Sequence, residues 1–208
     1  MNGEGFEFSP QLAKFNVPIA EFFASNPQYT EFITGAYIFS NGTDGGVDIQ
    51  TFTRTNSEPR VLLLQRSLTD DYGGCWEGPG GSCEHTDSTL LSALVREVFE
   101  ESGLHVSRVL DLVAVEDWDS GYTAQGKAKK AVKYSFLVDV HERALRAQQG
   151  ASGWEQQVTI APEEHEQFQW GTEEQVRKGT ETQEERFRFC GEEGSNFLKA
   201  FEAFRRLL

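Results

Sequence analysis

Residues 80–104 read GGSCEHTDSTLLSALVREVFEESGL, and this stretch decides how the rest of the chain is interpreted. It begins with a glycine pair and a short polar loop, and the apolar periodicity that follows predicts a helix from about Ser88 to Ser102. Gly103 is placed to end this helix in a left-handed conformation. Three polar residues are suitable N-caps, namely Thr86, Asp87 and Ser88.

The predicted helix has an apolar face and an acidic face. Glu97, Glu100 and Glu101 are spaced i, i+3 and i+4, so their carboxylates converge. Like charges at i,i+4 cost roughly 0.2–0.5 kcal/mol per pair in an isolated helix, and a hard divalent cation such as Mg²⁺ offsets that cost because it takes oxygen ligands. An ordinary solvated acidic face is the alternative, and the helix alone leaves both open. The apolar face consists of Leu91, Leu94, Val95, Val98 and Phe99.

The same stretch resembles the Nudix box, the signature of the Nudix hydrolase superfamily. That pattern runs Gly, five residues, Glu, seven residues, Arg-Glu, an aliphatic residue, any residue, Glu-Glu, any residue, Gly and an aliphatic residue. Gly81 is similar to its start, and Arg96 through Leu104 match its end at every specified place. The flanks are similar as well: Val61–Arg66 resembles the family's strand before the box, and Trp76–Gly81 resembles its Trp…Pro-Gly-Gly segment.

The chain departs from this pattern in two linked ways. One extra residue lies between Gly81 and Arg96, and the first glutamate of the box is missing. Counting forward from Gly81 puts Asp87 in its place, whereas counting back from Arg96 puts Ser88 there. Because a one-residue loop insertion costs little, we expect it before the helix, and the sequence leaves open whether Asp87 or Ser88 takes over the glutamate's role.

The resemblance implies metal-dependent hydrolysis of a diphosphate linkage in a nucleoside diphosphate derivative, with Mg²⁺, or Mn²⁺ in its place, as cofactor. It implies that Glu97, Glu100 and Glu101 hold the metal. Gly80 and Gly81 are expected to belong to the cofactor-binding site, where they let the backbone turn tightly beside the metal. These expectations come from the resemblance and agree with the carboxylate spacing on the helix.

The resemblance also suggests catalytic roles. Arg96 is expected to orient a carboxylate, with Glu100 as its i+4 partner, and a helix-surface ion pair is the alternative. The general base is either Glu101, acting through a metal-bound water, or a glutamate from a loop remote in sequence. In the segment PEEHEQFQW at 162–170 we favour Glu164 over Glu163 and Glu166, and we expect His165 to be structural.

Residues outside the box are expected to contact the substrate. Trp118 and Tyr122 are candidates to stack on a base, although Trp118 is equally suited to packing. Arg66 ends a predicted core strand and is a candidate to reach the site. A basic cluster beside a predicted hairpin turn is interpreted as a solvated charge run rather than a phosphate contact, and it consists of Lys127, Lys129, Lys130 and Lys133.

The alternative function is a non-catalytic Nudix-fold module that binds or senses a nucleotide. The complete Arg96–Glu101 motif argues against it, and the missing first glutamate keeps it open. Removal of an RNA cap is disfavoured, because the formal net charge is −14 and no basic channel is evident. The same charge excludes general nucleic-acid binding, which needs a basic face.

Composition bounds the remaining properties. Cys75, Cys83 and Cys190 lack metal-ligand spacing and are interpreted as reduced thiols of a cytoplasmic protein. Met1–Pro10 has no signal-peptide features, and no apolar run is long enough to span a membrane. The expected partner is a small nucleotide-derived substrate, and the sequence leaves a homodimer open.

The predicted fold class is α/β, and the resemblance implies a Nudix-type α/β/α sandwich with a mixed central sheet. We expect an N-terminal extension over residues 1–27, with a short helix at Pro18–Ser25, and a Nudix domain over residues 28–208. Further helices are predicted at Thr172–Lys178 and Asn196–Leu208. Strands are predicted at Phe32–Ser40, Arg60–Gln65, Val106–Val115, Ala131–Val140, Gln157–Ile160 and Phe168–Trp170, a turn at Asn41–Gly46, and loops or weak elements at Asp48–Pro59 and Arg143–Gly153.

Overall fold

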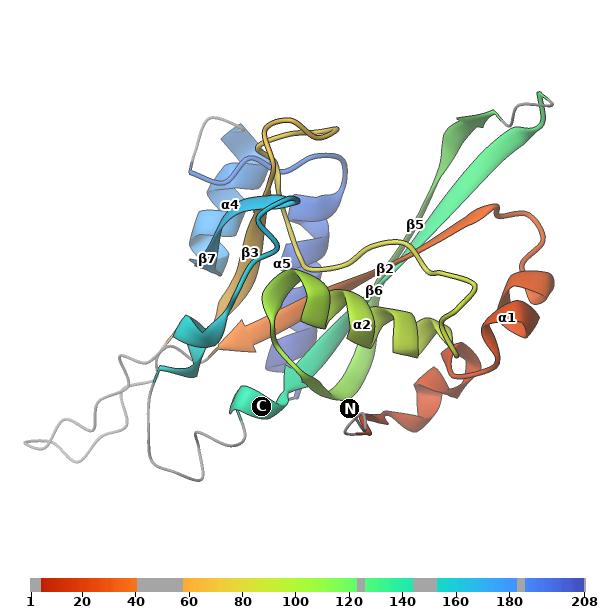
Figure 1. The fold of residues 1–208 in the computed structure, drawn as a ribbon. Helices are drawn as coiled ribbons and strands as arrows, with labels where there is room; N and C mark the ends of the chain where they lie inside the picture. Colours follow the sequence, from red (N-terminus) through yellow and green to blue (C-terminus); the bar gives the residue numbers. More distant parts are fainter. Residues whose placement is uncertain (1–4, 41–57, 123–125, 144–152, 183–185, 208) are drawn as a thin grey trace, which may run out of the picture.

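The fold was analysed in a computed structural model that describes residues 5–40, 58–122, 126–143, 153–182 and 186–207 (Figure 1). The mixed sheet has seven strands: β1 (Glu7–Phe8), β2 (Glu31–Ser40), β3 (Arg60–Arg66), β4 (Trp76–Glu77), β5 (Val106–Tyr122), β6 (Ala128–Val140) and β7 (His165–Thr172). The helices are α1 (Ile19–Ser25), α2 (Leu90–Ser102), α4 (Glu173–Thr182) and α5 (Glu193–Arg205), with 3-10 turns η1 (Pro10–Phe15) and η2 (Trp154–Gln157).

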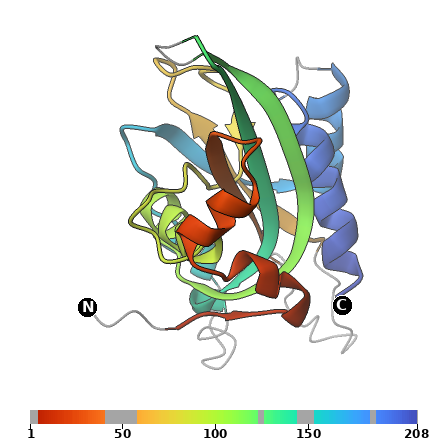
Figure 2. The ribbon, with the colours of Figure 1, turned by 90° about the vertical axis from the view of Figure 1, so that its right-hand side faces the viewer.

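The strand order β1-β5-β6-β2-β3-β4, with β7 on β3, makes the sheet mixed. β2 pairs with β6 in parallel, and β3 is antiparallel to β2, β4 and β7. The α/β fold class is therefore confirmed. Figure 2 shows α1 and α2 on one side of the long strands and α4 and α5 on the other.

Alternation along β3 explains why its sequence is a continuous aliphatic run. Leu62 and Leu64 pack in the cluster that includes α2 residues, whereas Val61 and Leu63 pack with α5 residues. Because successive side chains of a strand point to opposite faces, a strand covered on both faces needs apolar residues at every position.

The N-terminal elements contribute to the core. Leu12, Phe15, Ile19 and Phe22 are buried in the same cluster as the α2 residues. The Phe23 ring stacks on Phe32 of β2 at 4.4 Å. The first helix thus packs against β2, while the division at residue 27 and the homodimer stay predictions.

Several predicted boundaries shift. The strand expected at Gln157–Ile160 is wrong: η2 ends at Gln157, and residues 158–160 form no strand. β5 and β6 are longer than expected because they form one hairpin, in which backbone pairing continues out to Tyr122↔Ala128. The turn at 41–46, most of the 48–59 loop and residues 144–152 lie outside the described residues.

The cysteine interpretation is also wrong in part. Cys75 and Cys190 form a disulfide, with their Cα atoms 6.0 Å apart across a sequence separation of 115 residues. Cys83 is a free thiol, and burial raises its pKa to about 12. The sequence does not reveal the pair because only the folded sheet brings the loop before β4 beside the segment before α5. No described helix is long and apolar enough to cross a membrane.

Candidate active site

The N-cap of the helix that carries the acidic face lies one residue after Ser88, the last of the three predicted caps. Thr89 is the N-cap of α2: the Ser92 N–H donates to Thr89 Oγ1 at 3.0 Å, and the Thr89 N–H donates to Ser92 Oγ at 2.8 Å. This reciprocal pair satisfies two backbone donors at the helix start. The predicted C-terminus is confirmed, since Gly103 has φ 69° and its N–H donates to the Phe99 carbonyl.

Two carboxylates of α2 are buried beside the Gly-Gly loop. Glu97 is 9% exposed and Glu101 is 5% exposed, whereas Glu100 lies in solvent. The Gly80 N–H donates to Glu101 Oε2 at 2.7 Å. A Cβ on Gly81 would lie 2.6 Å from Glu97 Oε2, so the Glu97 carboxylate closely approaches the glycine backbone.

The buried carboxylates are electrostatically unfavourable as anions. Burial raises the pKa of Glu101 to about 9, and the charges of Glu77, Glu164 and Glu97 add to the shift against the Gly80 hydrogen bond. Burial also raises the pKa of Glu97, although Arg96 counteracts it. A cation bound between the two carboxylates would offset this cost.

The donor chemistry fits a hard divalent metal ion, because all the groups concerned are carboxylate oxygens. Within the described residues, however, no three His, Cys, Asp or Glu side chains form a preformed metal-ligating group. Arg96 explains the arrangement: its Nη1 donates to Glu97 Oε1 at 2.8 Å and to Glu100 Oε2 at 2.9 Å, which holds both carboxylates.

Arg96 also contacts one of the two residues that the sequence suggested in place of the missing glutamate. Its Nε donates to Asp87 Oδ1 at 3.0 Å and its Nη2 donates to Asp87 Oδ2 at 2.9 Å. Burial alone would raise the pKa of Asp87, but these hydrogen bonds lower it. Asp87, and not Ser88, therefore pairs with the arginine. With Asp87 in the place of the glutamate, the extra residue falls between Asp87 and Arg96, and its expected location before α2, which begins at Leu90, stays a prediction.

Within the segment at 162–170, Glu164 acts electrostatically on the two buried carboxylates. The Glu164 charge contributes to the raised pKa values of both Glu97 and Glu101. Glu166 instead accepts from the Leu68 N–H at 3.0 Å, and Glu163 is exposed. His165 is buried, with Nε2 3.7 Å from Glu77 Oε1.

Glu77 is a site residue that the sequence did not single out. It accepts from Arg66 Nη1 at 2.8 Å. Burial favours a raised pKa for Glu77, but the nearby His165 ring and the charges of Lys133 and Arg66 lower it, so the carboxylate is ionised. Its position directly after Trp76 in the segment before the glycine pair was the available signal.

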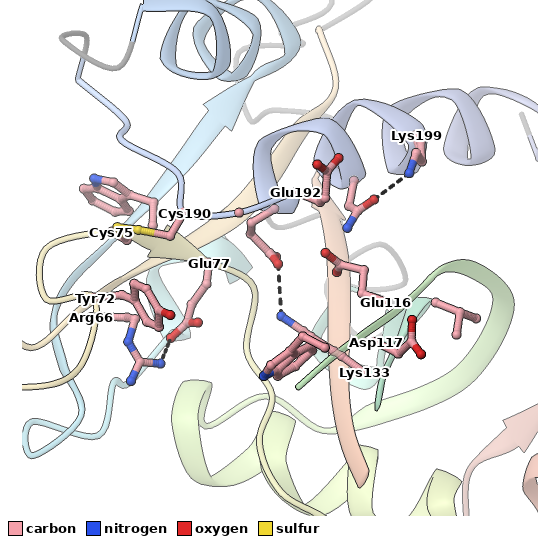
Figure 3. Close-up of a pocket in the computed structure, with 16 residues that line it drawn as sticks. Arg66, Tyr72, Cys75, Glu77, Glu116, Asp117, Lys133, Cys190, Glu192 and Lys199 are labelled. Carbon is pink, nitrogen blue, oxygen red and sulfur yellow. Dashed lines mark hydrogen bonds and ion pairs between the residues drawn. A yellow bond between two sulfur atoms is a disulfide. The ribbon is translucent and has the colours of Figure 1, made fainter. Parts of the chain in front are cut away.

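A pocket of about 700 Å³ is lined by Glu77, whose charge also contributes to the raised pKa of Glu101 (Figure 3). Trp118 lines it and Tyr122 does not. Of the predicted basic cluster only Lys133 lines the pocket, where its Nζ donates to Glu193 at 3.0 Å. The complete lining is Arg66, Tyr72, Cys75, Trp76, Glu77, Val115, Glu116, Asp117, Trp118, Lys133, Cys190, Gly191, Glu192, Glu193, Asn196 and Lys199.

Comparisons with known proteins agree with this geometry. An 8-oxo-dGTP diphosphatase from Proteus vulgaris is 45% identical over 56 residues, which are 26% of this chain and 49% of that protein, so the chain spans about half the length of its curated relative. Among solved structures, a MutT/nudix family protein from Enterococcus faecalis has a TM-score of 0.55 at 14% identity, covering 95% of this chain and 75% of that one.

A second structure gives a similar likeness. The NUDIX domain of Shewanella oneidensis NrtR, solved with ADP ribose, has a TM-score of 0.53 at 16% identity, covering 91% of this chain and 98% of that one. At these identities both structures establish the fold alone. The family model described as NUDIX domain matches residues 46–189, well over half of the sequence. The chain therefore belongs to the NUDIX family.

Proposed function

We propose that this protein is a divalent-metal-dependent pyrophosphohydrolase that cleaves a diphosphate linkage in a nucleoside diphosphate derivative. The observation that carries the proposal is the pair of buried carboxylates, Glu97 and Glu101, held against the glycine loop. Burying two like charges is unfavourable unless a cation accompanies them. Family membership and the diphosphatase relative support the same reaction class.

We assign the following roles. Glu97, Glu100 and Glu101 would hold the metal, Mg²⁺ or Mn²⁺, through their carboxylate oxygens. Such an ion, when bound, neutralises phosphate charge and lowers the pKa of water. The Gly80 N–H orients Glu101 by occupying its Oε2, and Arg96 orients Glu97 and Glu100.

The general base in this proposal is Glu164. Glu164 is exposed and lies directly before β7, and its charge acts on Glu97 and Glu101. A glutamate side chain is one of the groups that enzymes use to accept a proton from an attacking water. Glu101 is less suited, because burial keeps its carboxyl protonated when no cation is present.

The substrate lies across two neighbouring regions. Its diphosphate is placed at Glu97 and Glu101, and its nucleoside in the adjacent pocket, with Glu77 at the boundary. The pocket volume of about 700 Å³ is within the range of small-molecule sites. Compounds related to the ligands of similar proteins, 8-oxo-dGTP and ADP ribose, belong in the first panel.

The test is a phosphate-release assay with Mg²⁺, Mn²⁺ or EDTA, with added phosphatase to reveal monophosphate products. The panel holds nucleoside triphosphates, oxidised nucleotides, ADP ribose, NADH and dinucleoside polyphosphates. Turnover that needs a metal and is lost in Glu97→Gln supports the proposal. Glu202→Gln, which changes an exposed glutamate of α5, is the matched control. Metal-dependent turnover that is equal in Glu97→Gln and Glu202→Gln would refute the site assignment.

A nucleotide-binding module without turnover is the second candidate, and the missing first glutamate is the feature that favours it. The bidentate contact of Asp87 with Arg96 argues against this second candidate, since that pairing keeps Arg96 in contact with Glu97 and Glu100. Tight binding of one panel member, with no product under either metal, would identify the protein as the module.

A further inference from the structure

Tyr72 has an unusual backbone and an unusual exposure. It lies in the loop between β3 and β4 with φ 60°, and it is the one non-glycine residue with positive φ in the described part of the chain. Its side chain is 74% exposed. A left-handed backbone is costly for a bulky residue, and such conformations concentrate at functional sites. Because an exposed ring gains little from packing, burial does not account for the tyrosine.

The loop is hydrogen-bonded so that this conformation is held. The Gly73 N–H donates to the Asp70 carbonyl at 3.0 Å, and the Gly74 N–H donates to the Arg66 carbonyl at 3.1 Å. Arg66 Nε donates to the Asp71 carbonyl at 2.9 Å. A Cβ on Gly73 would lie 2.7 Å from the Leu68 carbonyl oxygen, so the turn directly after Tyr72 requires glycine. The fixed backbone presents the ring in a defined place.

That place is the rim of the pocket. Tyr72 lines it, and so does Trp118, which is 42% exposed on β5. β6 and β2 separate β5 from β3, so the two aromatic residues come from different walls. Figure 3 shows Tyr72 near Arg66 and Glu77, with Asp117 on the far side.

The charged residues that line the pocket disfavour binding of a phosphate group inside it. Each lining cation is already engaged: Arg66 with Glu77, Lys133 with Glu193, and Lys199 with Asn196. The lining carboxylates outnumber these cations and are Glu77, Glu116, Asp117, Glu192 and Glu193. A flat, uncharged aromatic ring fits this environment, because it stacks on aromatic faces and carries no negative charge.

We propose that Tyr72 is a substrate-binding residue whose ring stacks on the nucleobase, with Trp118 as the second aromatic wall of the base site. This rests on the proposed function, since the phosphates of the same ligand lie at Glu101. Tyr72 lines the pocket from a left-handed backbone, and Glu77 lines the same pocket and acts on Glu101 through its charge.

The test measures binding of AMP, GMP, CMP and UMP to the full chain by calorimetry, for wild type, Tyr72→Ala, Tyr72→Phe and Tyr72→Gly. For the nucleotide that binds best, loss of the ring in Tyr72→Ala and Tyr72→Gly should raise Kd by about five- to hundredfold. Tyr72→Phe keeps the ring and should retain the wild-type Kd. Tyr72→Gly separates the ring from the backbone, because glycine accepts φ 60°.

Two controls isolate stacking. Leu68→Ala removes an apolar side chain of the same loop that is 71% exposed and does not line the pocket, and it should leave Kd unchanged. Ribose 5-phosphate has no base and should bind wild type and Tyr72→Ala equally.

Equal Kd values for wild type and Tyr72→Ala, or no binding of any of the four nucleotides, would overturn the proposal. An increase of Kd in Tyr72→Phe as large as in Tyr72→Ala would also overturn it, because the hydroxyl and not the ring would then matter. These measurements need no turnover, so the base site stands or falls separately from the hydrolytic activity.

Discussion

Arg96 and Asp87 form a bidentate ion pair, with nitrogen–oxygen distances of 3.0 and 2.9 Å. The aspartate side chain is shorter than the glutamate of the family pattern, and the chain has one extra residue between the two partners. The pair nevertheless leaves Nη1 of Arg96 on Glu97 and Glu100. Asp87 therefore acts on the acidic face of α2 through the arginine.

Replacing Asp87 by Asn should lower kcat while the fold is kept. The amide cannot match the charge of the guanidinium, so Arg96 loses its fixed orientation, and groups that orient metal ligands typically contribute ten- to hundredfold in affinity or activity. The measurement is the Mg²⁺ dependence of kcat. Ser88→Ala, at the other position suggested by the sequence, is the control and should behave as wild type. A larger loss in Ser88→Ala than in Asp87→Asn would contradict the assignment.

The metal-free protein should lose stability as pH rises. Burial raises the pKa of Glu101 to about 9 from its ordinary value of 4.5. Below 4.5 the folded and unfolded states are both protonated, whereas between 4.5 and about 9 only the unfolded state has released the proton. Unfolding then becomes easier by at most about 1.4 kcal/mol per pH unit from this group.

Urea unfolding in EDTA from pH 5 to 9 measures this effect. Glu101→Gln cannot ionise, so its free energy of unfolding should fall less steeply with pH than that of wild type. Added Mg²⁺ should stabilise wild type most at high pH. Identical pH slopes for wild type and Glu101→Gln would mean that Glu101 is not a strained buried carboxyl.

Breaking the Cys75–Cys190 disulfide should destabilise the fold and weaken substrate binding. The bond joins the loop before β4 to the segment that leads into α5, so it fixes the pocket wall that carries Glu192 and Glu193. Losing a native disulfide typically costs about 2–5 kcal/mol. Cys190→Ser should lower Tm and raise KM, and Cys83→Ser should do neither. Alkylation of three thiols in the unreduced, unfolded protein would show that the bond does not form.

The Lys133–Glu193 pair should be essential to stability at the pocket floor. Both side chains are largely buried, and their contact is 3.0 Å. Lys133→Met leaves Glu193 as an unpaired buried charge, which typically costs about 3–5 kcal/mol. The double variant Lys133→Met/Glu193→Gln removes both charges and should recover part of the lost free energy of unfolding. No recovery in chemical denaturation would show that the pair is not coupled.

The features that depend on local pattern were predictable from the sequence. α2 and its end at Gly103 follow from a 3.6-residue period and a glycine, and β3 follows from an uninterrupted aliphatic run. Convergence of Glu97 and Glu101 follows from helical spacing alone. The start of α2 was missed because several neighbouring polar residues suit a cap, and only the reciprocal contact of Thr89 with Ser92 selects one.

The features that depend on tertiary contact were not predictable. Glu77 joins the site because β4 pairs with β3, which sets it beside Arg66. The Cys75–Cys190 bond and the choice of Asp87 over Ser88 also need the folded loops. The two glycines that follow Tyr72 indicate a tight turn at its left-handed backbone. The pocket beside it, however, is formed by strands that are distant in sequence.

The most direct test of the central claim is the Mg²⁺-dependent rate of phosphate release by Glu101→Gln, compared with Glu202→Gln. The account predicts that Glu101→Gln lowers kcat by more than about hundredfold, since a direct metal ligand matters more than the groups that orient ligands. It also predicts that Glu202→Gln keeps the wild-type rate and that both variants fold. A folded Glu101→Gln that turns over substrate at the wild-type rate would contradict the account.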